Sequence, residues 1–113
     1  MKRSPLKRNT RLRPRRRKRD QDVPFADEIK KRDFWACRRC QLHRGWVVIQ
    51  CAHIFGKQAY PKVRYDPQNA IALCKGCHRW AHDHPFEFRD WVVGWMGQAA
   101  FDALGRRARG VES

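Results

Sequence analysis

Four cysteines and three histidines in this chain occur at spacings that suit metal chemistry. The cysteines form two Cys-x-x-Cys pairs, Cys37/Cys40 and Cys74/Cys77. A gap of two residues lets one backbone turn aim both sulfurs at one ion, so two pairs can present four thiolates tetrahedrally to Zn²⁺. A redox dithiol would need one pair at a helix start in a β-α-β setting, which the sequence lacks. We therefore predict a structural zinc, closed by four cysteines and taking no part in catalysis.

Four further residues between and after these pairs suit hydrolysis of a phosphodiester: His53, Asn69, His78 and His82. Such hydrolysis needs a base that takes a proton from water and a metal ion that neutralises the scissile phosphate. His53 follows a strand-like segment and can be the base, with Asn69 orienting it across a hairpin through its amide or its backbone carbonyl. His78 and His82 are four residues apart, so on a helix both imidazoles can bind one metal ion.

Each of these residues also has a plainer interpretation. A histidine in a strand is commonly a satisfied polar residue, His78 could simply neighbour a zinc cysteine, and His82 could lie at the surface. Cys51, the fifth cysteine, sits in an apolar segment and is expected to be a buried, unreactive thiol. It is the joint order and spacing of the residues, together with the charge of the chain, that favours catalysis.

The charge of the chain predicts a nucleic-acid partner. The 113 residues include 26 Lys and Arg against 11 Asp and Glu, a net charge of +15, and no apolar run approaches the length of a membrane span. Eleven of the basic residues lie in residues 1–19, which contain no acid and too few apolar residues to fold alone. We expect this segment to be disordered and to contact DNA phosphates without sequence preference, chiefly through Arg15, Arg16, Arg17, Lys18 and Arg19. In the loop after His53, the residues expected to contact phosphate are Lys57, Lys62 and Arg64.

Periodicity and breaker residues predict a small α+β domain at residues 23–113, preceded by the basic segment at 1–22. We expect a helix over 25–35, a strand over 46–52, a long loop over 55–68 and a second strand over 70–73. Helices are expected over 77–82, from 85 onward, and over 98–108. The zinc cysteines would then join the end of the first helix to the second strand and the helix after it.

With these residues in view, the stretch 37–82 resembles an HNH endonuclease of the zinc-stapled ββα-metal type. The motifs that carry the resemblance are CRRC at 37–40, CAHIFGK at 51–57, NAIALCKGCH at 69–78, and His82. The resemblance implies a ββα-metal (HNH) fold with flanking helices and a DNA-hydrolysing activity. It makes His53 the general base, Asn69 its positioner and His78 a ligand of a catalytic divalent ion, with His82 as a second ligand. Mg²⁺ or Mn²⁺ is the expected ion, with Ni²⁺ or Zn²⁺ as alternatives.

A closer resemblance is to phage recombination nucleases of the NinG/Rap kind. It rests on AHIFGK, on YPKVRYDPQNAIALCKGC at 60–77 and on GQAAFDAL at 97–104. This resemblance implies a phage or prophage protein in the cytoplasm of a bacterial host, acting on branched or duplex DNA during recombination or DNA processing. A homodimer with two-fold symmetry would suit junction cutting, although the sequence does not decide it.

One position departs from the HNH pattern. Many HNH enzymes carry an acidic residue or a histidine just before the base, as a metal ligand, and this chain has Ala52 there. The residues that could replace the lost ligand are His43, Asp66, Asp83 and His84. The alternative function is therefore a zinc-stapled DNA-binding protein without catalysis. A third hypothesis, an HNH toxin acting on host DNA or RNA, would need a delivery segment, and none is seen.

Overall fold

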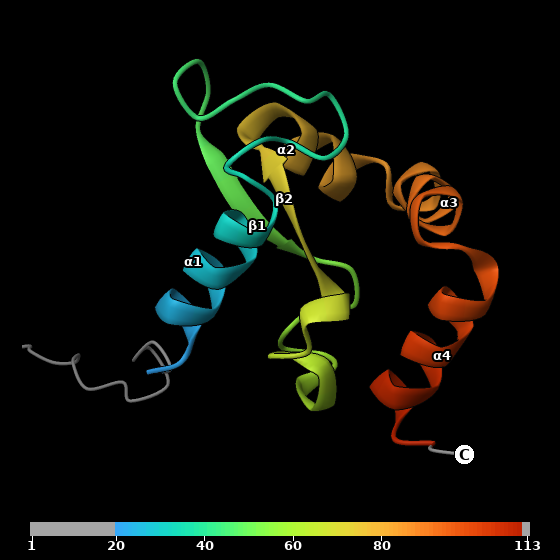
Figure 1. Ribbon diagram of the computed structural model, residues 1–113. Coiled ribbons are helices and arrows are strands. Elements are labelled where there is room, and N and C mark those ends of the chain that lie inside the picture. Colours follow the sequence, from blue (N-terminus) through green and yellow to red (C-terminus); the bar gives the residue numbers. More distant parts are fainter. Residues whose placement is uncertain (1–19, 112–113) are drawn as a thin grey trace, which may run out of the picture.

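The protein is described here by a computed structural model for residues 20–111, in which one antiparallel hairpin is surrounded by four helices (Figure 1). The α+β class expected from the sequence is confirmed. The elements in chain order are α1 (Asp22–Arg32), β1 (Ile49–His53), the 3-10 turns η2 (Pro61–Val63) and η3 (Pro67–Asn69), β2 (Ala70–Cys74), α2 (Lys75–Asp83), α3 (Pro85–Met96) and α4 (Gln98–Arg109).

Some element boundaries differ from those expected, for local reasons. Helix α1 spans Asp22–Arg32 instead of the expected 25–35, so it begins and ends three residues earlier and starts one residue before the expected domain boundary. Strand β1 begins at Ile49 rather than at 46, because the N–H groups of Trp46 and Val47 both bond to the carbonyl of His43 and close a turn there. Helix α2 begins at Lys75, since the preceding cysteine caps it. The basic residues 1–19 lie outside the described residues.

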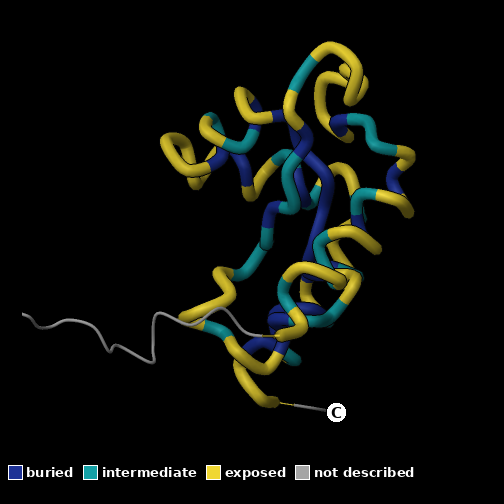
Figure 2. The backbone as a smooth tube through the Cα atoms, turned by 90° about the vertical axis from the view of Figure 1, so that its left-hand side faces the viewer, coloured by how far each residue is buried: buried dark blue, intermediate teal, exposed yellow. Residues whose placement is uncertain are grey.

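The hairpin places His53 of the candidate catalytic set at one end and Cys74 of the cysteine set at the other. In its register His53 pairs with Ala70 at one end, and Ile49 pairs with Cys74 at the other. All five residues of β2 are buried, whereas in β1 only Ile49 and Ala52 are buried and the other three residues are partly exposed. Figure 2 shows the buried positions gathered along this hairpin and the exposed ones along the loops and the outer faces of the helices. A strand buried throughout needs cover on both faces and on its free edge.

The free edge of β2 is covered by the end of α1 and by the segment after it. The N–H of Ala72 donates to the buried carboxylate of Asp33 over 2.9 Å, and the carbonyl of Ala72 accepts from the N–H of Arg38. The guanidinium of Arg32 donates to the carbonyl of Ala70 and to Asp33. These bonds satisfy backbone groups that an uncovered strand would leave without partners.

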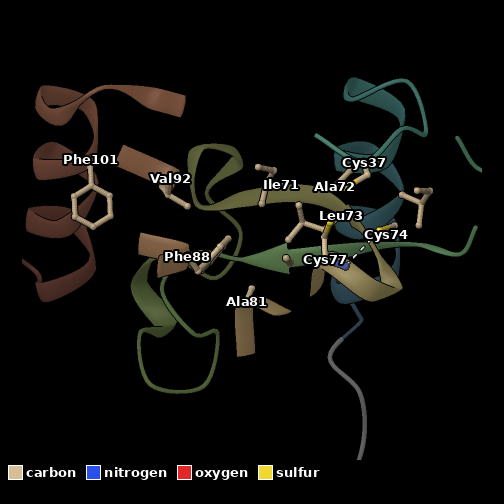
Figure 3. Close-up of a cluster of buried hydrophobic side chains, with 12 residues drawn as sticks. Cys37, Ile71, Ala72, Leu73, Cys74, Cys77, Ala81, Phe88, Val92 and Phe101 are labelled. Atoms are coloured by element: carbon tan, nitrogen blue, oxygen red, sulfur yellow. Dashed lines mark hydrogen bonds between the residues drawn. The ribbon is translucent and has the colours of Figure 1, made fainter. Parts of the chain in front are cut away.

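Helix α2 packs against both strands, and α3 and α4 follow it in turn on the side of the molecule away from α1 (Figure 1). Their buried side chains form the main apolar cluster, in which Ile71 and Leu73 of β2 are grouped with Phe88, Val92 and Phe101 (Figure 3). A smaller cluster joins α4 to the loop between the strands. None of the helices within residues 20–111 is both long enough and apolar enough to span a membrane.

The hydrogen bond from β2 to Asp33 predicts that replacing Asp33 lowers the stability of the protein. Replacing Asp33 with Ala leaves the buried N–H of Ala72 unbonded, so we expect a loss of about 1–3 kcal/mol in the free energy of unfolding. Urea denaturation of the zinc-loaded protein measures this loss. Asp27→Ala is the control, because that carboxylate is on the exposed face of the same helix. Equal stability of the two variants would contradict the assignment.

Candidate metal centre and active site

The four cysteines converge on one point. The Sγ atoms of Cys37, Cys40, Cys74 and Cys77 all lie within 4.8 Å of one another, and those of Cys40 and Cys74 are 3.6 Å apart. Four sulfurs bound to one zinc at 2.3 Å in a tetrahedron lie about 3.8 Å apart. The cluster can therefore hold a structural metal such as zinc, as the spacing predicted. Within residues 20–111 it is the only group of three or more such ligands.

Backbone hydrogen bonds favour the thiolate form of Cys37, whereas burial raises the pKa of the Cys40 and Cys77 thiols. The N–H of Cys40 donates to the Sγ of Cys37 over 3.4 Å, and that of Cys77 donates to the Sγ of Cys74 over 3.3 Å. Burial raises the pKa of the Cys37 thiol, but backbone hydrogen bonds outweigh burial and lower this pKa to about 7. Such bonds repeat at the two pairs because each Cys-x-x-Cys turn directs an N–H back toward its first sulfur.

One arginine beside the cluster was not anticipated from the sequence. The guanidinium of Arg39 donates to the Sγ of Cys77 over 3.4 Å and lies over the ring of Trp80, 3.6 Å from the ring centre. Four thiolates around Zn²⁺ carry two excess negative charges, and a cation in contact with a sulfur offsets part of them. Arg39 thus joins the first cysteine pair to helix α2.

His53 ends β1 with its ring fixed by a backbone carbonyl. Its Nε2 lies 2.9 Å from the carbonyl oxygen of Arg64. Because a carbonyl only accepts, Nε2 carries the proton and Nδ1 is left as the acceptor in the neutral ring. Burial lowers the pKa of His53 below its usual value, which keeps the ring neutral near pH 7. The ring also packs beside Phe25 of α1. These contacts leave the imidazole in the form that a general base requires.

The carbonyl that orients His53 is itself held by α1. The Arg64 side chain is buried, and its Nε and Nη2 donate to the two carboxylate oxygens of Asp22 over 3.1 and 2.8 Å. The hydroxyl of Tyr65 donates to the same carboxylate over 2.6 Å. Hydrogen bonding from Arg64 holds the pKa of Asp22 well below its usual value. The expected contact of Arg64 with DNA phosphate does not fit this geometry, since its guanidinium is already paired in the interior.

Asn69 shapes the loop rather than bonding His53. This fully buried side chain accepts the N–H of Phe55 over 2.7 Å and donates to the carbonyls of Phe55 and Val63. Its own carbonyl accepts the N–H of Ile54. The expectation that Asn69 bonds the His53 ring is therefore corrected, because Arg64 supplies that carbonyl. Asn69 acts one step away, by fixing both ends of the loop that contains Arg64.

His78 and His82 lie on one face of α2, as their spacing predicted. Their ring centres are 4.9 Å apart, and Nδ1 of His78 is 2.7 Å from the side-chain oxygen of Gln50. An oxygen of an amide accepts, so Nδ1 carries the proton and Nε2 of His78 is free to bind a metal ion. Gln50 is a second residue that the sequence did not single out.

All three histidines line one open pocket of about 520 Å³. Lys57 lines it as well, whereas Lys62 is not part of the wall. The described wall contains no carboxylate, and Ala52 is buried within it. None of the residues considered as replacements for the missing ligand, namely His43, Asp66, Asp83 and His84, lines the pocket. Asp66 instead accepts from Arg107.

Cys51 also lines the pocket. It is partly exposed rather than buried, and burial raises the pKa of its thiol to about 11, so the thiol stays protonated at neutral pH. This agrees with the expectation that it is unreactive.

Comparison of the chain with protein-family models, with curated proteins and with solved structures gives no match.

The cysteine cluster predicts one tightly held zinc per chain. Cys40→Ser removes one ligand, so we expect zinc content by mass spectrometry to fall well below one per chain and the melting temperature to drop by more than about 10 °C. Cys51→Ser is the matched control, because its thiol is outside the cluster. Full zinc content in the Cys40 variant, or its loss in both variants, would refute the assignment.

Proposed function

We propose that this protein is a metal-dependent endonuclease that hydrolyses DNA phosphodiester bonds. The observation that carries the proposal is the single pocket lined by His53, His78 and His82, in which His53 presents a free Nδ1. The net charge of +15 supports a polyanionic substrate. The resemblance of residues 37–82 to HNH endonucleases agrees with both features.

The roles of the residues follow from their contacts. His53 takes a proton from water at Nδ1, while its Nε2–H stays bonded to the Arg64 carbonyl, so the imidazolium that forms keeps its orientation. His78 and His82 are the residues that would hold a divalent ion, through Nε2 in the case of His78. The bound ion would neutralise charge on the scissile phosphate and the leaving oxygen. Lys57, exposed at the pocket wall, would bind an adjacent phosphate.

The resemblance to NinG/Rap-like nucleases refines the proposed substrate. On that basis the protein is encoded by a phage or prophage, works in the cytoplasm of a bacterial host, and cuts branched DNA during recombination. Comparison of a four-way junction with linear duplex of the same sequence would test this refinement. If the junction is cleaved less than about two-fold faster than the linear duplex, this refinement is wrong, and the nuclease proposal is unaffected.

A second candidate is a zinc-stapled DNA-binding protein without catalysis. It is favoured by one observation: the described wall of the histidine pocket contains no carboxylate, and Ala52 occupies the position of a common HNH ligand. In this case the histidines would be remnants, and the protein would bind DNA without cutting it in Mg²⁺, Mn²⁺, Ni²⁺ or Zn²⁺.

The central experiment is a cleavage assay on supercoiled plasmid and branched DNA across these four ions. His53→Ala should lower the cleavage rate by about 10²–10⁴-fold, since it removes the base, while DNA affinity is retained. His43→Ala is the control, because His43 is exposed and outside the pocket. Undiminished cleavage by purified His53→Ala would exclude His53 as the base, and no cleavage by the unaltered chain in any ion would favour the second candidate.

The support of His53 by α1 gives a further prediction. Asp22→Asn removes the charge that pairs with Arg64, so the Arg64 carbonyl and the His53 ring should become mobile. We expect the turnover rate to fall about ten-fold with little change in DNA affinity, and ring ¹⁵N NMR should show a mixture of His53 tautomers. Asp27→Asn on the same helix is the control. A single Nε2–H tautomer in the Asp22 variant would contradict the proposed support.

A further inference from the structure

A second pocket adjoins the histidine pocket, between α3 and α4. It has a volume of about 430 Å³ and shares Phe55, Arg89 and Phe101 with the histidine pocket. The remaining wall comes from α4: Asp102, Gly105, Arg106 and Arg109. Because three residues line both pockets, the two pockets adjoin at these residues, and together they are called the groove below, which extends from the histidines to α4.

The floor of this groove is aromatic. The rings of Phe55 and Phe101 stack with their centres 5.6 Å apart, and the guanidinium of Arg89 lies 5.6 Å above the centre of the Phe101 ring. Contact with an aromatic face holds a guanidinium in place without neutralising it. Arg89 is therefore positioned at the junction between the two pockets with its charge available.

A buried glycine makes room for a second arginine. A Cβ atom at Gly105 would lie 3.2 Å from Nη1 of Arg109 and 3.6 Å from the Phe55 ring. Glycine inside a helix is less favourable than alanine, so its presence here needs a packing reason. The missing side chain lets the Arg109 guanidinium fold back over the helix toward Phe55, into the groove.

The positive charges of this groove are not compensated by the described part of the chain. Other arginines form ion pairs with acids, such as Arg64 with Asp22 and Arg107 with Asp66. Within residues 20–111, no carboxylate lies within ion-pair distance of Arg89, Arg106 or Arg109. All three side chains are exposed, so their charges are available to a ligand. The one acid in the wall, Asp102, accepts from the amide of Gln98.

We infer that Arg89, Arg106 and Arg109 bind the phosphodiester backbone of the DNA strand that enters the histidine pocket. The inference rests on the proposed function for the direction of the strand. Guanidinium groups bind phosphate oxygens through paired N–H donors, and three of them along one groove offer several separate contacts to a phosphate backbone. The groove thus extends the phosphate contacts away from Lys57, onto α3 and α4.

The test is duplex binding by the full-length, zinc-loaded protein without added divalent ion, measured by fluorescence anisotropy over a range of salt concentrations. Arg89→Ala, Arg106→Ala and Arg109→Ala should each reduce the slope of log affinity against log salt by about 0.9 and weaken binding roughly five-fold near 0.15 M salt. Lys31→Ala is the control, since Lys31 is exposed on α1, across the hairpin from this groove. Circular dichroism checks that each variant is folded.

Two results would overturn the inference. Slopes that change no more than that of Lys31→Ala would show that the arginines do not contact DNA. Calorimetric loss of inorganic-phosphate binding in the arginine variants, with duplex binding unchanged, would show a site for a free ion instead. This outcome can be distinguished from that of the nuclease proposal. Reduced salt slopes in the arginine variants, without cleavage by the unaltered chain, would support DNA binding by the groove and reject the nuclease activity. Cleavage by the unaltered chain, with unchanged slopes in the variants, would support the nuclease activity and reject DNA binding by the groove.

Discussion

The convergence of four cysteines is the constraint on which the other parts of this structure depend. Cys37 and Cys40 come from the segment after α1, Cys74 ends β2, and Cys77 lies in the first turn of α2. A metal ion at this point would join the helix that supports His53 to the helix that contains His78 and His82. A domain of this size has a modest apolar core, so a cross-link between these segments contributes much of what fixes their relative positions.

The candidate site is assembled from residues far apart in the sequence, each fixed by a different contact. His53 is oriented by the carbonyl of Arg64, whose side chain is paired with Asp22 at a separation of 42 residues. His78 is oriented by Gln50 on the neighbouring strand. The imidazoles of His53 and His78 thus reach one pocket with defined tautomers, and the described wall of that pocket contains no carboxylate. This arrangement suits a base beside a weakly coordinated metal ion.

The sequence predicted the elements whose signals are local. The apolar run AIAL predicted β2 to within one residue, and the helix expected over 98–108 is α4, to within one residue at its end. The cysteine cluster followed from spacing alone. The contacts that orient His53 could not be predicted, because nothing in the sequence indicates that Asp22 and Arg64, 42 residues apart, form an ion pair. For the same reason Arg64 was expected to bind DNA and Asn69 to bond His53, whereas the structure gives both residues internal partners. Gly105 had no visible role until the position of Arg109 was known.

We propose that His53, His78 and His82 surround one divalent-ion site distinct from the cysteine cluster. Titration of zinc-loaded protein with paramagnetic Mn²⁺, followed by NMR of the histidine ring nitrogens, tests it without relying on activity. We predict that sub-stoichiometric Mn²⁺ broadens the ring signals of His78 and His82 most and that of His53 next, with His43 least affected. Broadening at the three pocket histidines no greater than at His43 would contradict the claim.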